Sequence, residues 1–144
     1  MSTPVESANL CLKLYELRRE PVLREARQWF LKEFNPQSAD ELFTIIGGER
    51  NASFRMVLGY WEMAASFVTF EAIDAAMFRA ANGEIIAVFA KLEPYLPAIR
   101  ERNRNPDVGH HLEMVVRDMP GATERAVLLR EGFRRLAETA QSAK

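Results

Sequence analysis

The sequence has little chemistry based on sulfur or imidazole, since its 144 residues include one cysteine and two histidines. A single cysteine forms no internal disulfide and leaves no cysteine pair for a zinc knuckle or a redox motif. A nucleophilic thiol needs a histidine or another cation nearby to lower its pKa, and no histidine lies close to Cys11 in the sequence. Cys11 is therefore predicted to be a small buried core residue, and the lack of disulfides fits a reducing compartment.

An excess of charge of either sign is also missing, because 19 basic residues stand against 20 acidic ones. This balance excludes a polyanion-binding protein that works through bulk charge. The sequence shows no helix-turn-helix or zinc signature either, so nucleic acid is not an expected partner.

No uncharged apolar run long enough for a membrane span is present. The best candidate, 56–78, contains Glu62, Glu71 and Asp74. An acidic residue at bilayer depth costs ~2.5–3.5 kcal/mol, so we expect no membrane span. Residues 1–6 lack the basic and apolar segments of a secretory signal, so the expected location is the cytoplasm.

What the sequence does contain is apolar residues, 48% of the total, placed at helical spacing along almost the whole chain. No segment shows the alternation of a β-strand, and the length suits one domain with a sizeable core. The sequence predicts an all-α, single-domain, mostly antiparallel helical bundle of about seven to eight helices over residues 1–144. We expect disordered ends at 1–4 and 142–144.

Proline, glycine and capping residues divide this pattern into segments. The expected helices cover roughly 5–19, 21–34, 38–46, 50–68, 69–82, 84–100, 106–119 and 122–141. Ser38 and Glu41 have the spacing of a capping box. Pro94 and Pro97 interrupt the sixth helix, which predicts a kink or break near Lys91–Glu93. The fourth helix is apolar around most of its circumference, which is typical of the centre of a bundle.

Glu62 is a polar exception on that fourth helix, on one line with Arg55, Gly59 and Ser66 and between two apolar stripes. Small residues at 59 and 66 would let another helix approach and bury Glu62 in part. A buried carboxylate must be paired, hydrogen-bonded or protonated. We therefore expect a structural ion pair of Glu62 with Arg55 or Arg100. A general base or ligand anchor, and simple exposure, are the open alternatives.

Aromatic and methionine side chains beside Glu62 would also suit a pocket for an apolar ligand, although core packing explains the same spacing. In that alternative the protein is a small-molecule sensor or enzyme. Its candidate ligand-binding residues are Tyr60, Trp61, Glu62 and Arg100. No catalytic triad, carboxylate pair or cofactor fingerprint occurs, so we name no catalytic residue and expect no cofactor.

The nearest approach to a metal site is Asp107 with His111, four residues apart on an expected helix. One helix offers too few ligands and no HExxH run is present, so we expect no bound metal. His111 is predicted to pack inward and His110 to face solvent. The arginines at 100, 102 and 104 have acidic neighbours, which is typical of a solvated face with local ion pairs.

Several short tracts together resemble a family of small bacterial all-helical proteins known only as a domain of unknown function. The tracts are Leu14-Tyr15-Glu16-Leu17-Arg18-Arg19, the helix around Trp29, Tyr60-Trp61-Glu62, and Lys91-Leu92-Glu93-Pro94-Tyr95-Leu96 with Ile99-Arg100. The resemblance covers about residues 10–104 and implies an all-helical domain without an established activity, substrate or cofactor. It also implies that Glu62 and Arg100 belong to the shared pattern. Many proteins similar to that family begin with a membrane helix, which this sequence does not show.

A well-specified core without a recognisable reaction centre leads to one functional hypothesis. We expect a non-enzymatic helical binding or interaction module of unknown biochemical role. Its expected partner is a second copy of itself, as a homodimer, or another protein. An exposed apolar patch of several hundred Å² would support this hypothesis.

Overall fold

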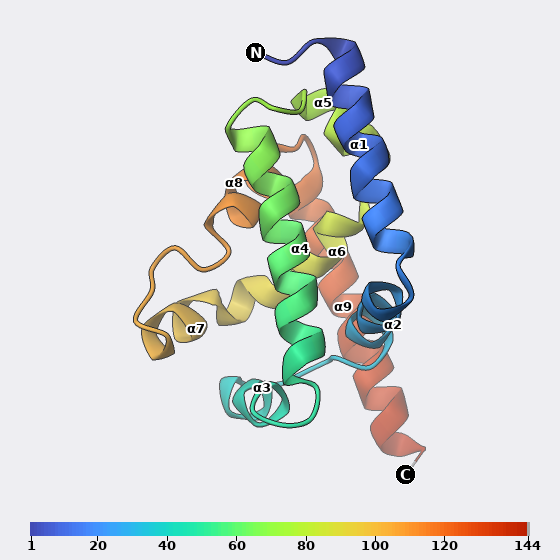
Figure 1. The fold of residues 1–144 in the computed structure, drawn as a ribbon. Helices are drawn as coiled ribbons and strands as arrows, with labels where there is room; N and C mark the ends of the chain where they lie inside the picture. The colour runs from blue at the N-terminus through green and yellow to red at the C-terminus, as the bar shows by residue number, and fades with distance from the viewer. Residues whose placement is uncertain (144) are drawn as a thin grey trace.

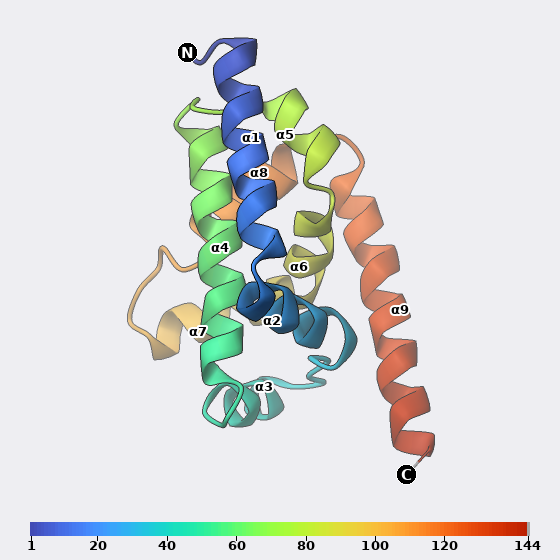
Figure 2. The same ribbon diagram turned by 45° about the vertical axis from the view of Figure 1, so that its right-hand side comes forward.

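A computed structural model describes residues 1–143 of the chain, which fold into helices and contain no strand. Their bounds are α1 (Pro4–Arg19), α2 (Pro21–Lys32), α3 (Ala39–Ile46), α4 (Asn51–Thr69), α5 (Ala75–Ala81), α6 (Glu84–Leu92), the 3₁₀ helix η1 (Glu93–Tyr95), α7 (Leu96–Arg102), α8 (His110–Asp118) and α9 (Ala122–Ser142). In Figures 1 and 2, α4 runs antiparallel to α1 and to α9, while α2, α3 and α7 lie across the bundle. The predicted all-α bundle is confirmed.

Capping residues next to the first turn explain where α1 and α3 begin. Thr3 and Glu6 form a complete capping box at the start of α1, where each side chain accepts the other's backbone N–H. Ser38 caps α3 by accepting the backbone N–H of Glu41, as predicted. The carboxylate of Glu41, however, accepts from the backbone N–H of Gln37 and not from that of Ser38. Only half of the predicted capping box therefore forms.

The predicted sixth helix breaks at its prolines. α6 ends at Leu92, η1 covers the next turn, and α7 begins at Leu96. A proline ring clashes with the carbonyl four residues before it, so the α-helix cannot continue through Pro94. This break accounts for the difference between the eight expected helices and the nine α-helices of the described chain. The expected fifth helix begins at residue 69, but Thr69 is the last residue of α4. α5 begins later, after Asp74, whose side chain accepts the backbone N–H of Met77.

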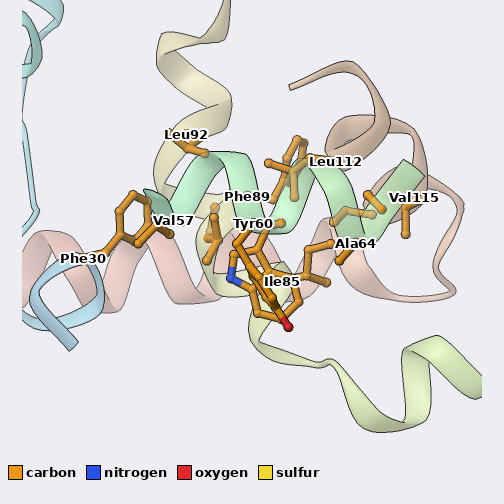
Figure 3. Close-up of a cluster of buried hydrophobic side chains, with 14 of the residues drawn as sticks. Phe30, Val57, Tyr60, Ala64, Ile85, Phe89, Leu92, Leu112 and Val115 are labelled. Atoms are coloured by element: carbon orange, nitrogen blue, oxygen red, sulfur yellow. The ribbon is translucent and has the colours of Figure 1, made fainter. Parts of the chain in front are cut away.

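The hydrophobic core surrounds α4, as its apolar circumference predicted. α4 packs against both α2 and α8, and its Trp61 is fully buried. Figure 3 shows core side chains that these helices and α6 contribute around α4, among them Phe30, Val57, Tyr60, Ala64, Ile85, Phe89, Leu92, Leu112 and Val115. Cys11 packs against the edge of this core but is only partly buried, and burial raises the pKa of its thiol. A raised pKa disfavours the reactive thiolate.

The predicted disorder of the chain ends stays a prediction. In the structure Thr3 caps α1, and the backbone N–H of Ser2 donates to the carbonyl of Glu71. At the other end α9 extends to Ser142, and Lys144 lies outside the described residues. Across residues 1–143, no helix combines the length and the apolar character that a membrane crossing requires.

Candidate functional site

A cavity of about 310 Å³ opens between α9, the connection from α2 to α3, and the junction of α6 with η1. Its apolar lining is formed by Phe34, Pro36, Pro94, Val127 and Phe133. Its polar lining is formed by Asn35, Gln37, Lys91, Tyr95, Arg130, Glu131 and Arg134. Figure 2 shows the lower half of α9 running beside the connection that follows α2. The cavity thus lies where three segments far apart in the sequence meet.

Local sequence explains how these segments form the walls. Pro36 ends the helical path after α2, and Pro94 turns the chain out of α6 into η1. On α9, Val127, Arg130 and Arg134 follow one another at intervals of three and four residues. This spacing places them on one side of the helix, so a single face of α9 forms the third wall.

Lys91 is almost completely buried at the cavity, with 5% of the residue exposed. Its Nζ donates to the carbonyl oxygens of Phe30, Leu31 and Phe34 at 2.7, 2.9 and 2.8 Å. A fourth acceptor, Oδ1 of Asn35, lies at 3.0 Å. The last carbonyls of a helix lack partners within the helix, so Lys91 supplies from α6 the cap that the end of α2 needs.

Two opposing effects act on the Lys91 ammonium. Burial lowers the pKa of Lys91 to about 7, because desolvation disfavours the charged form. The surrounding oxygens and the ring of Phe133, whose centroid lies 4.1 Å from Nζ, favour the charged form. Lys91 therefore joins α2, α6 and α9 at one point.

Tyr95 fixes the connection after α2 in a similar way. Its hydroxyl donates to the carbonyl oxygen of Pro36 at 2.8 Å. Burial raises the pKa of Tyr95, so its hydroxyl stays protonated at neutral pH. Tyr95 and Lys91 together hold residues 34–36 against α6 and η1, which keeps this wall of the cavity in place.

Arg130 anchors α9 to the junction of α6 and η1. Its Nε donates to the carbonyl of Ala90 and its Nη2 to the carboxylate of Glu93, both at 2.8 Å. Glu93 also binds Arg117, which in turn binds Glu113. Arg100 completes the series through Glu113 at 3.2 Å. A chain of alternating charges therefore connects the cavity wall with α8 and α7.

The other two charged residues of α9 at the cavity are held more weakly. Arg134 pairs with Glu138 at 3.3 Å, and both side chains are about 60% exposed. Glu131 faces Arg135 at 3.8 Å on the surface. Exposed pairs one turn apart on a helix contribute only ~0.3–0.5 kcal/mol, so the guanidinium of Arg134 is readily available to a ligand.

The structure does not bring the sequence-predicted ligand residues together in this cavity. Tyr60 and Trp61 face α1 and the core. The hydroxyl of Tyr60 donates to the carbonyl of Leu14 at 2.7 Å and accepts from Arg18. The indole N–H of Trp61 is buried and has no hydrogen-bond partner within residues 1–143, while the Arg18 guanidinium lies 5.4 Å from its ring.

Glu62 faces the opposite way and caps α8. Its carboxylate accepts the backbone N–H groups of His111 at 3.2 Å and Leu112 at 2.8 Å. The residue before α8, Gly109, has no side chain to do this. No arginine nitrogen lies within 4 Å of this carboxylate in the described chain, and Arg55 is exposed, so the predicted ion pair does not form. The spacing of residues along α4 could not predict that backbone N–H groups at the start of α8 would donate hydrogen bonds to the Glu62 carboxylate.

Arg100 holds the same helix start from the other side. Its Nε donates to the carbonyl of Val108 at 2.8 Å, and its Nη2 binds Glu113. Glu62 and Arg100 are thus connected through the first turn of α8 and not with each other. A Cβ at Gly59 would meet nothing within 4 Å, so the close helix approach predicted at this position does not occur.

The Asp107 and His111 pair does not form the start of a metal site. Nδ1 of His111 lies 2.7 Å from the hydroxyl of Thr69, and its ring packs beside Phe70. Over residues 1–143, no three histidine, cysteine, aspartate or glutamate side chains are placed to hold a metal ion. His111 is half-buried and His110 exposed.

Sequence reasoning missed the cavity residues. Lys91 was the available signal, because a single lysine within the apolar segment 85–92 must reach solvent or a set of acceptors. The residues of α9 gave no signal, since Arg130 and Arg134 have the spacing of an ordinary solvated face.

Comparison with known protein families gave a match over most of the chain. A model of the family described as "Domain of unknown function (DUF4760)" matches residues 3–119. No curated protein and no solved structure matches the chain. The matched range contains two walls of the cavity, at 34–37 and 91–95, and ends before α9, which forms the third.

Proposed function

We propose that this chain, which belongs to the family described as "Domain of unknown function (DUF4760)", is a non-enzymatic binding module that holds a small molecule beside α9. The family match confirms the resemblance to a domain of unknown function. The observation that carries the proposal is the cavity of about 310 Å³, with an apolar lining and a few convergent polar groups. Ligand sites of proteins typically have this composition and begin at about 300 Å³.

The state of the polar groups supports binding over catalysis. Lys91 donates to four oxygens and Tyr95 to a carbonyl, so both already serve the fold. A catalytic nucleophile or base needs a free functional atom and a second group that orients it. The fixed walls also favour binding, because a pre-formed site loses little conformational entropy when a ligand enters.

A neutral fluorescent probe tests the proposal. N-phenyl-1-naphthylamine should show enhanced emission that saturates as a single class of site. Val127→Trp should reduce its affinity at least about tenfold, because the indole would fill the cavity. Leu128→Trp is the matched control, since Leu128 is the next residue of α9, is 68% exposed and does not line the cavity. Equal binding by both variants would refute the proposal.

A second candidate function is an interaction module that forms a homodimer through α4. Met56, Met63 and Phe70 follow one another at seven-residue intervals, and all three are exposed. This interval keeps them on one face of the helix and its end. Analytical ultracentrifugation of the native chain and of Met63→Glu tests this candidate. It predicts a dimer that the substitution dissociates, and a native monomer at high concentration would exclude it.

A further inference from the structure

We infer that the cavity beside α9 binds an amphipathic anion, a molecule with an apolar body and one carboxylate or comparable acidic group. This inference rests on the proposed binding function and specifies its ligand. Three observations carry it: the balance of charge in the lining, the availability of the arginines, and the apolar side chains that line the same cavity.

The charged lining is mainly positive. It consists of Lys91, Arg130 and Arg134 against the single carboxylate of Glu131. Lys91 contributes only part of a positive charge at neutral pH, because burial lowers its pKa to about 7, so the positive charge comes mainly from the two arginines. A cleft with one excess sign of charge and apolar walls concentrates the field and attracts the opposite charge.

The arginines retain donors that a ligand can use. Arg130 is held in place by Ala90 and Glu93 through Nε and Nη2, and its Nη1 donates to no group within residues 1–143. Arg134 has only its exposed contact with Glu138. A guanidinium presents paired N–H groups that match the two oxygens of a carboxylate, so these side chains suit an acidic head group.

Apolar side chains line all three walls, whereas both arginines lie on α9. Phe34 and Pro36 follow α2, Pro94 lies in η1, and Val127 and Phe133 lie on α9 beside the arginines. A ligand in the cavity would place its acidic group against Arg130 and Arg134 and its apolar body against these apolar side chains. This arrangement selects molecules that have both parts.

Two probes with the same ring system separate the contributions of body and charge. 8-Anilino-1-naphthalenesulfonate carries an anionic group that the neutral N-phenyl-1-naphthylamine lacks. The anionic probe should bind the native protein about fivefold more tightly. Arg134→Gln should remove most of this preference and leave the affinity for the neutral probe unchanged. Arg125→Gln, an exposed position of α9 outside the cavity lining, should alter neither affinity.

Glu131 provides a test of opposite sign. Glu131→Gln removes the only acidic group of the lining, so it should raise the affinity for the anionic probe about twofold and leave the neutral probe unaffected. Circular dichroism of each variant should show unchanged helix content, because all three substitutions lie at exposed positions of α9.

The results distinguish failure of the ligand class from failure of the site. If both probes bind equally and Arg134→Gln leaves their ratio unchanged, the anionic ligand is excluded while the binding site stands. If neither probe responds to Val127→Trp, the proposed binding site itself is excluded, and the inference with it. A ratio that falls in Arg134→Gln but not in Arg125→Gln supports the inference.

Discussion

Single side chains stabilise this fold largely by binding the ends of helices. Glu62, an anion, meets the N-terminal N–H groups of α8, and Lys91, a cation, meets the C-terminal carbonyls of α2. Both signs agree with the helix dipole, which is positive at its N-terminus and negative at its C-terminus. In each case the cap comes from a residue distant in sequence, so it also fixes the position of one helix relative to another.

Removing the Glu62 cap should therefore lower stability although no ion pair is broken. We expect Glu62→Ala to reduce the free energy of unfolding by about 1–2 kcal/mol, since it leaves two N–H groups of α8 without acceptors. Urea unfolding followed by circular dichroism measures this change. Arg55→Gln serves as the control and should have no effect. A loss of similar size in Arg55→Gln would instead indicate the ion pair that the sequence suggested.

Loss of the Lys91 amino group should lower the stability more, because three carbonyls and an amide oxygen would lose their N–H donors together. We expect Lys91→Met, which fills nearly the same volume, to lower the free energy of unfolding by about 3 kcal/mol. Lys32→Met, at an exposed position in the last turn of α2, is the control and should change it little.

The same pair of proteins should reveal the altered pKa of Lys91. In the folded state burial lowers this pKa to about 7, from an ordinary value of 10.5. Between these values the unfolded chain binds a proton that the folded chain has released, so stability rises with pH. Below pH 7 both states are protonated and the dependence ends. The stability difference between the native protein and Lys91→Met should therefore grow from pH 7 to pH 9, and a constant difference would refute the shifted pKa.

At the scale of elements, the sequence predicted the helices well and the contacts of their polar residues poorly. Helical spacing and prolines reflect local sterics, so they located α4 and the break after Leu92. The partner of Glu62 depends on where the start of α8 comes to lie, which is decided by packing between distant segments. The cavity could not be predicted from the sequence for the same reason, because α9 and residues 34–37 come together only in the folded chain.

Glycines inside two helices give a prediction about element stability. A Cβ at Gly59 of α4 or at Gly132 of α9 would meet nothing within 4 Å. Alanine at either position should stabilise the protein by about 1 kcal/mol, since glycine has a low helix propensity. Thermal unfolding should show a melting temperature about 4 °C higher for each.

Gly109, just before α8, is the contrasting case. Its φ is +69°, and an added Cβ would lie 3.0 Å from a methyl group of Leu96. Gly109→Ala should therefore lower the melting temperature. If alanine at Gly59, Gly132 and Gly109 shifted the melting temperature in the same direction, the contrast between Gly109 and the two helical glycines would be wrong.

At the scale of the whole molecule, α9 differs from the other helices in two ways. It lies outside the range that the family model matches, and it forms the third wall of the cavity. The series of ion pairs from Arg130 through Glu93 and Arg117 connects this helix with α8. Its last turns have few contacts with the body, since residues 138–142 are exposed. A ligand between α9 and the connection after α2 would add contacts to α9 just before this exposed segment.

Binding in the cavity should therefore stabilise the fold as a whole and protect α9 in particular. A ligand that binds only the folded state, at a concentration 100 times its Kd, raises the free energy of unfolding by about 2.7 kcal/mol. With 8-anilino-1-naphthalenesulfonate at that excess, hydrogen exchange of the amides in α9 and of Phe34, Asn35 and Gln37 should slow more than exchange in α1, which lies away from the cavity. Val127→Trp should abolish this local protection. Slowing that is strongest in α1 would place the probe outside the cavity, because ligand contacts suppress local opening first where they are made.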